Sequence, residues 1–167
     1  KKRTNFSYSS NWRWLMSFHT ALINVEDEKI SSEKAKKFIT SDKNGAESVF
    51  IGRVRNENTG KKVTAVSYDA HDLAVIKSFK SICADAINKF DKSAKVFLEH
   101  AKGYVPVGEI SILIAVGSGH RDEAFKICRY VLEEVKHQSP IWKKEHYVDG
   151  EEEWLPGHSL RPKKEIK

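Results

Sequence analysis

A basic pair stands at an unusual place in the sequence, where an apolar strand-like run ends and a helix is expected to begin. Gly117-Ser118-Gly119 is followed by His120 and Arg121, which would occupy the first turn of that helix. The helix dipole disfavours cations at this end. A strand, a turn of small residues and exposed helix amides form a cradle for an anion, which a basic pair would reinforce. The pair therefore predicts an anion-binding site.

The apolar stripe of this helix predicts where the pair points. At about 100° per residue, Arg121 lies within about 20° of Cys128, which belongs to the stripe. We therefore expect Arg121 on the inner face of the helix and His120 at the edge of that face. Two structural alternatives fit the periodicity as well, namely a core histidine with satisfied hydrogen bonds and an arginine paired with a carboxylate.

Five further basic residues could serve the same chemistry. Lys136 ends the helix, where the dipole favours a cation even without a functional role. Lys143 and Lys144 follow a proline in a segment that alternates like a strand, so they should point to opposite sides. Arg53 and Arg55 lie at a strand end beside a loop, where solvated charge is the usual interpretation.

The elements that must position these residues alternate along the chain. Turn signals and apolar periodicity separate them. The predicted order is a helix capped by Ser31 or Ser32, strands at 46–55 and 62–68 joined as a hairpin by the turn "NENTG", a helix capped by Asp72, strands at 94–100 and 110–116, the long helix to Lys136, and a strand after Pro140.

Composition limits the classes of protein. The chain has 167 residues, of which 40% are apolar, enough for one domain with a real core. Lys and Arg outnumber Asp and Glu by 29 to 23, which indicates an anionic partner without specifying its kind. No apolar run approaches the roughly 20 residues that span a bilayer. Cys83 and Cys128 fall on helical core stripes without metal-ligand spacing, so neither a disulfide framework nor a metal site is expected.

The first 21 residues differ from the rest because they contain no acidic residue. We expect residues 1–21 to be a poorly ordered basic extension, residues 22–155 to form the domain, and residues 156–167 to be a basic tail. A transit peptide would have this composition, and so would a non-native leader, since Met16 could itself be the initiator.

Three motifs in order carry a resemblance: "GRVRN", "VGSGHRDEAF" and "PIWKKE", the last followed by an acidic stretch and Trp154. From about Ile23 to Trp154 the chain resembles the catalytic, large subunit of molybdopterin synthase. Two segments depart from the family pattern. His71 in "YDAH" stands where the family has an aromatic residue, and Ala101 in "HAKG" stands where it has an arginine, so details of the pocket wall should differ.

The resemblance implies an α+β fold, a single domain of the α/β hammerhead type preceded by the extra basic segment. It also implies a homodimer at the centre of a heterotetramer, in a cytoplasmic enzyme. Each end would bind a small ubiquitin-like sulfur carrier whose C-terminal Gly-Gly ends in a thiocarboxylate. The reaction would convert cyclic pyranopterin monophosphate to molybdopterin by installing two sulfurs as a dithiolene. No metal or other cofactor, nucleic acid or membrane is expected.

Site residues carry over from the family's motifs. From the chemistry of the two anionic reactants, we assign Lys136 to the end of the carrier tail, as its charge partner and a candidate proton donor, and Lys143 to proton transfer as the substrate ring opens. The family also places an arginine near the C-terminus in the pocket of the second subunit, to which His158 or Arg161 would correspond. The substrate-binding positions implied are Arg53, Val54, Arg55, His120, Arg121, Lys136, Lys143, Lys144 and Glu145.

Two alternatives from other classes stay open at this stage. A small basic domain could bind RNA through Arg53, Arg55 and Lys143 with Trp142 or Tyr147 as stacking contacts. The sequence lacks an RNP-like aromatic motif and a GxxG loop, which counts against RNA binding. A homologue that has lost catalysis could only scaffold the carrier, but intact His120 and Lys136 argue against this.

Overall fold

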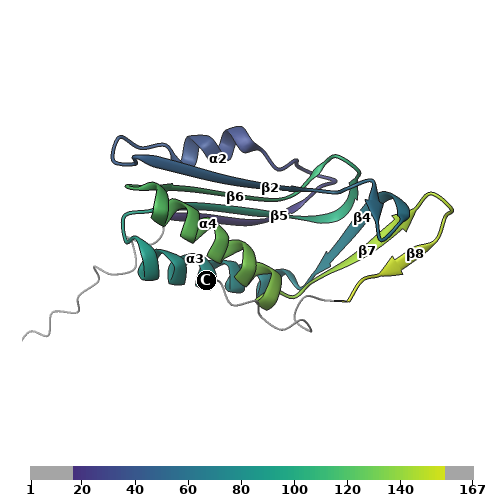
Figure 1. Ribbon diagram of the computed structural model, residues 1–167. Coiled ribbons are helices and arrows are strands. Elements are labelled where there is room, and N and C mark those ends of the chain that lie inside the picture. Colours follow the sequence, from purple (N-terminus) through teal and green to yellow (C-terminus); the bar gives the residue numbers. More distant parts are fainter. Residues whose placement is uncertain (1–16, 157–167) are drawn as a thin grey trace, which may run out of the picture.

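The structure, a computed structural model, describes residues 17–156 (Figure 1). Three helices and eight strands follow one another in this part of the chain. In order they are β1 (Phe18–Asn24), α2 (Ser32–Ile39), β2 (Ala46–Arg53), β3 (Glu57–Asn58), β4 (Lys61–Ala70), α3 (Asp72–Phe90), β5 (Lys95–Pro106), β6 (Ile110–Ser118), α4 (Arg121–Gln138), β7 (Ile141–Tyr147) and β8 (Glu152–Trp154).

The main sheet has β6 between β2 and β5, and β1 pairs with β5 on the other side. Helix α2 covers one face of this sheet, while α3 and α4 cover the opposite face (Figure 1). Because helices cover both faces, a central strand can be apolar throughout. Strand β6 is buried from Ser111 to Ser118, which confirms the prediction that the run after Ile110 is a central strand.

A second group of strands extends from one end of the main sheet. Strand β5 pairs with β1 up to Lys102 and then with β4 from Gly103 to Pro106. Gly103 has φ of +100°, a conformation that residues with a side chain rarely adopt. Strands β7 and β8 continue outward from β4, so that β4, β7 and β8 project beyond the helices (Figure 1).

Each face of the main sheet has its own core. Under α3 and α4, the cluster contains Phe79, Cys83, Ile127 and Cys128, as the helical stripes predicted. Under α2, it contains Ile39, Phe97 and Leu113 among others. The sheet is therefore held from both sides by apolar burial.

One predicted pairing is wrong. Strands β2 and β4 do not form a hairpin, because β2 pairs with β6 whereas β4 pairs with β5 and β7. The turn at Thr59 and Gly60 instead joins the two-residue strand β3 to β4. Turn residues report a reversal of the chain but not which strand lies beside which.

Two predicted boundaries also shift. The expected boundary after residue 21 falls inside β1, whose residues Phe18 to Asn24 pair in parallel with β5, so 18–21 belong to the sheet. Ser31 caps α2 as one of the two alternatives predicted, but His71 rather than Asp72 caps α3. Residues 1–16, with Met16, and the tail 157–167, with His158 and Arg161, lie outside the described residues.

No helix among residues 17–156 is long and apolar enough to cross a membrane.

A buried carboxylate joins β1 and α2 to β5. The Glu99 side chain is 1% exposed, and its Oε1 lies 2.9 Å from both His19 Nε2 on β1 and Lys34 Nζ on α2. Burial opposes ionisation of Glu99, but the hydrogen bonds from His19 and Lys34 outweigh it, so the pKa of this carboxyl lies below its ordinary value. Its Oε2 is buried without a hydrogen-bond partner among the described residues.

Replacing Glu99 should therefore destabilise the fold in a pH-dependent way. We expect Glu99→Gln to lower the free energy of unfolding by about 1 to 3 kcal/mol at pH 7, since the hydrogen bonds are to a buried charged group. Because the pKa of Glu99 is lower in the folded state than in the unfolded state, its ionised carboxylate stabilises the fold at pH values above 4.5, the unfolded value. That stabilisation is lost as the pH falls through the lower folded pKa. Urea unfolding of both proteins across pH 3 to 7 measures the difference.

The matched control is Glu109→Gln, which removes an ion pair with Lys29 between side chains that are 50% and 80% exposed. It should cost at most about 1 kcal/mol. A Glu99→Gln effect no larger than this control, or one that grows in acid, would contradict the role assigned to the buried carboxylate.

Candidate active site

Lys136 and Lys143 line the same pocket, although they come from different elements. We call it the lysine pocket. It lies where the end of α4, the start of β7 and the junction between the two groups of strands meet, and its volume is about 140 Å³. Its lining comprises Tyr68, His100, Ser111, Ile112, Val135, Lys136, Ser139, Ile141, Trp142, Lys143, Leu155 and Pro156.

A short connection brings the two lysines together. Helix α4 ends at Gln138, the amide of the capping residue Ser139 donates to Val135 O, and Pro140 stops the helix from continuing. Strand β7 then runs back antiparallel to β4, with Lys143 opposite Tyr68. The helix end and the strand start therefore face a common space.

Lys144 points away from the lysine pocket, as the alternation of a strand predicts. Its ammonium pairs with Glu152 on β8 and lies 5.8 Å from the centre of the Trp154 ring. Lys144 lines a separate, open hollow beside Asp72 and Lys102. The prediction that the two adjacent lysines face opposite sides is confirmed.

Glu145, which was expected beside the substrate, is held inside the protein. It is 6% exposed, and both carboxylate oxygens accept from Asn58 Nδ2, at 3.1 and 3.0 Å. The Tyr147 hydroxyl donates to it at 3.0 Å, and its charge helps to raise the pKa of Tyr147, after burial, to about 12. In this chain Glu145 therefore links β7 to β3 through its hydrogen bonds with Asn58.

Three polar side chains form the inner wall of the lysine pocket, and site prediction from the sequence missed all three. The Tyr68 ring meets His100 edge-on, with centroids 5.1 Å apart, and the Tyr68 hydroxyl hydrogen-bonds with Ser111. Ser111 in turn donates to Gly52 O at 3.2 Å. Burial raises the pKa of Tyr68, so its hydroxyl stays a donor at neutral pH.

The signals for this wall were present but weak. Tyr68 and His100 fall in "YDAH" and "HAKG", and Ser111 is a polar residue opening a buried apolar strand. The two departures from the family pattern, His71 and Ala101, are not among the residues that line the lysine pocket.

His120 and Arg121 lie at the other end of α4. The start of this helix is anchored through Asp91, whose Oδ2 accepts from Ser118 Oγ at 2.5 Å and Gly119 N at 3.4 Å. Both basic side chains are exposed, beside a shallow hollow with Gly45. The prediction that Arg121 faces inward is wrong for the single chain, since the first turn of α4 extends past the core.

The length of α4 sets the distance between the basic pair at its start and Lys136 at its end. Fifteen residues of α4 separate Arg121 from Lys136, a rise of about 22 Å. One chain therefore does not bring the basic pair to the lysine pocket.

The "GRVRN" segment lies at the end of β2 and is also outside the lysine pocket. Arg53 Nη1 donates to Gly108 O at 2.8 Å and lines another cavity with Lys29 and Tyr104. The Val54 side chain is 5% exposed and packs in the core under α2, so it does not offer a surface to a substrate. Arg55 is exposed just beyond the strand.

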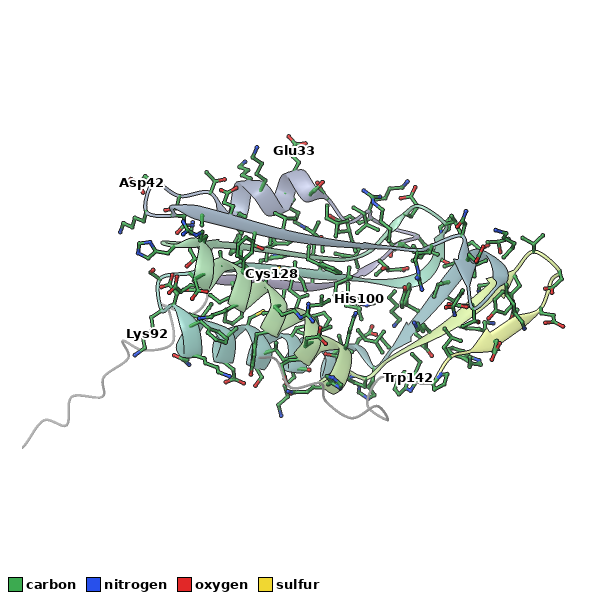
Figure 2. All side chains as sticks on the ribbon, viewed as in Figure 1. Glu33, Asp42, Lys92, His100, Cys128 and Trp142 are labelled. Carbon is green, nitrogen blue, oxygen red and sulfur yellow. The ribbon has the colours of Figure 1, made fainter. Side chains whose placement is uncertain are left out.

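Neither cysteine is placed for sulfur chemistry. Cys83 is fully buried and Cys128 is 7% exposed, both in the core under α3 and α4, where Figure 2 shows Cys128 on α4. Burial raises the pKa of both thiols. Within residues 17–156, no cluster of three or more His, Cys, Asp or Glu side chains could hold a metal ion.

Comparison with known proteins gives a consistent result. A family model described as "MoaE protein" matches residues 25–138. The molybdopterin synthase catalytic subunit of Synechococcus elongatus is 41% identical over 126 residues, which cover 75% of this chain and 76% of that protein. The corresponding subunit of Dictyostelium discoideum is 37% identical over 81% of this chain and 87% of its own.

Solved structures have the same fold. Molybdopterin synthase from Staphylococcus aureus superimposes with a TM-score of 0.74 at 30% identity, covering 84% of this chain and 97% of that one. A complex of subunits 1 and 2 of the molybdopterin-converting factor from Helicobacter pylori gives a TM-score of 0.63 at 19% identity, covering 87% of this chain and 92% of that one, a likeness of fold.

The burial of the cysteines can be tested by alkylation. In the native protein, Cys83 and Cys128 should react with N-ethylmaleimide only as fast as the core opens, because a buried thiol is neither accessible nor readily ionised. In urea, both of the two free thiols should react at once. Intact mass spectrometry counts the adducts, and rapid labelling of either thiol under native conditions would contradict the burial.

Proposed function

The chain belongs to the MoaE protein family of molybdopterin synthase catalytic subunits, and from this premise we propose that Lys136 and Lys143 form its catalytic centre. As a catalytic subunit of this kind, it transfers sulfur in molybdenum cofactor biosynthesis. The observation that carries the assignment of the two lysines is their meeting in one pocket from separate elements.

The two reactants that we propose are both anions. One is the C-terminal Gly-Gly thiocarboxylate of a small ubiquitin-like carrier subunit, and the other is cyclic pyranopterin monophosphate. Held together they repel each other, so a site for both must supply positive charge and orientation. A pair of lysines in a partly enclosed pocket supplies that charge.

The environments of the two lysines support different roles. Lys136 is exposed at the end of α4 and forms no ion pair with the described residues, so its ammonium can meet the carboxyl terminus of the carrier. Lys143 is half-buried on β7, where it is paired with Tyr68 of the polar wall. We assign Lys143 to proton transfer as the substrate ring opens, with Lys136 as the partner of the tail.

The buried cysteines support a sulfur source outside the chain. A cysteine that carries sulfur must be accessible and readily ionised, and neither Cys83 nor Cys128 is. The carrier thiocarboxylate supplies the nucleophile instead. Free thiols also suit a reducing compartment, and we place the reaction in the cytoplasm.

A second copy of the chain would complete the site. The lysine pocket is smaller than the roughly 300 to 1,000 Å³ of most ligand sites. Two of the other residues assigned to the substrate, His120 and Arg121, lie about 22 Å from Lys136 along α4. Both facts support a homodimer in which the start of α4 from one copy reaches the lysine pocket of the other.

The open edge of the sheet offers the geometry for such a dimer. Strand β2 is the outer strand beside β6, and its Val49 and Ile51 side chains are 52% and 38% exposed. Because Ala46 pairs with Ser118, just before α4 begins, β2 and α4 run in the same direction. They also have similar lengths, about 26 Å for the strand and about 27 Å for the helix.

Antiparallel pairing of two β2 strands follows the twofold symmetry that most homodimers have. It would set the start of α4 in one copy beside the end of β2 in the other. There His120 and Arg121 of the second copy would join Arg53, Arg55 and Lys136 of the first. The heterotetramer follows when each of the two sites receives one carrier tail.

The lysine assignment predicts a separation of activity from stability. With saturating thiocarboxylated carrier, Lys136→Ala and Lys143→Ala should each lower turnover at least about tenfold, a loss of over about 1.4 kcal/mol of transition-state stabilisation. Their melting temperatures should stay within a few degrees of the wild type, because neither side chain is part of a core. Turnover and calorimetry measure the two quantities.

Lys144→Ala is the matched control from the opposite face of β7. It loses a partly exposed ion pair worth at most about 1 kcal/mol, and turnover should fall less than in either pocket variant. Near-normal turnover of Lys136→Ala and Lys143→Ala would leave the pocket as a docking surface and refute their catalytic assignment.

The dimer predicts that two inactive variants restore each other. In a mixed dimer of Arg121→Ala and Lys136→Ala, one of the two sites combines only unmutated residues, and the other carries both changes. Random exchange of equal amounts should thus recover about a quarter of wild-type activity. Activity is assayed after co-expression of the two chains.

A mixture of Lys136→Ala and Lys143→Ala should recover nothing, because both lysines belong to one pocket of one chain. If the first mixture is no more active than its two components, the pair at the start of α4 does not serve the site of a second copy. Ile51→Lys should in addition weaken the dimer in sedimentation.

A further inference from the structure

His100 lies in the wall of the lysine pocket, and the proposed function leaves it without a role. It is 9% exposed and belongs to the part of β5 that precedes Gly103. Figure 2 shows His100 at the same end of the main sheet as Trp142, which also lines the pocket. A buried histidine that shares a pocket with two reactive lysines is a candidate for chemistry rather than for packing alone.

One hydrogen bond determines where the proton of this ring lies. His100 Nδ1 is 2.8 Å from Ala101 O, and a carbonyl oxygen can only accept, so Nδ1 carries a hydrogen. Burial lowers the pKa of His100 to about 4, although the bond to Ala101 opposes this, and the ring is therefore neutral at pH 7. Its second nitrogen, Nε2, keeps a lone pair.

The neighbours of His100 hold its ring in place and favour its neutral form. Tyr68 packs edge-on against it and is itself fixed through Ser111. The charged groups that line the pocket with it, Lys136 and Lys143, are cations and disfavour a third positive charge. Glu145, whose charge acts on Tyr68, is hydrogen-bonded to Asn58 and Tyr147.

Sulfur transfer from a thiocarboxylate requires a proton acceptor. Once the tail sulfur bonds to a substrate carbon, carrier and substrate are joined through a thioester. Sulfur stays on the substrate only if water adds to the acyl carbon and the carbon–sulfur bond to the carrier breaks. The carrier then leaves as a carboxylate and the substrate as a thiolate, so water gives up two protons, one to a base during the attack and one to solvent when the new carboxyl group ionises. Protonated lysines cannot accept the first proton, since an ammonium has no lone pair.

We propose that His100 is the general base for this hydrolysis, with Nε2 taking the proton from the attacking water. The oxygen–carbon bond forms as the carbon–sulfur bond breaks, the electron pair leaves with sulfur, and His100 returns the proton to the solvent or to the thiolate. The lysine ammonium groups stabilise the negative charge that develops on oxygen and sulfur. The assignment rests on the proposed function of the lysine pocket.

His100→Asn tests the assignment, because an Asn amide can still donate to Ala101 O but offers no nitrogen lone pair in place of Nε2. In a single turnover with thiocarboxylated carrier and cyclic pyranopterin monophosphate, this variant should accumulate a covalent carrier–substrate adduct, visible by intact mass spectrometry. Steady-state turnover should fall at least about 100-fold, the lower end of what a general base contributes. Added imidazole should release the adduct and restore part of the rate.

The control is His19→Asn, at a partly buried histidine on the opposite face of the sheet, which should lose stability but accumulate no adduct. If His100→Asn does not fold, His100→Gln replaces it. Adduct-free turnover near the wild-type rate, or unreacted substrate in place of an adduct, would overturn the role of His100. Failure of the wild type to form product would instead overturn the proposed function.

Discussion

The change of partner along β5 is the constraint on which the site depends. Up to Lys102 this strand lies in the main sheet beside β1 and β6, and from Gly103 it pairs with β4. The positive φ of Gly103 allows the strand to redirect, and a Cβ there would lie 3.3 Å from Val25 Cγ2. Because β4 carries β7 with it, this one junction sets Tyr68 and Lys143 opposite His100 and the end of α4.

Local features of the fold could be predicted from the sequence because local physics decides them. Helical periodicity identified the buried stripes with Cys83 and Cys128, and strand alternation put Lys143 and Lys144 on opposite sides. Strand partners depend on contacts far apart in the chain, which is why the hairpin between β2 and β4 was wrong. The exposure of Arg121 was missed because periodicity gives a direction around a helix but does not show where the core ends.

The site itself was only partly predictable for the same reason. Family motifs identified the lysines, and the predicted length of the helix already puts its two ends about 22 Å apart, but the sequence does not show which side chains from other elements meet at either end. His100 has no periodic signature, since its proposed role depends on a carbonyl one residue on and on lysines supplied by α4 and β7. A polar residue in an otherwise apolar strand is the sequence signal that indicates a site residue of this kind. Ser111 in β6, which also lines the lysine pocket, is another example.

Helix α4 belongs to two sites at once in the proposed dimer, and this limits how the chain can change. Its first turn would serve one site and its last turn the other, so the helix acts as a spacer whose length the symmetry fixes. Inserting one residue would lengthen it by about 1.5 Å and turn one end by about 100° relative to the other. Surface loops generally tolerate insertions and deletions, whereas in the proposed dimer α4 would be free to vary in composition but not in length.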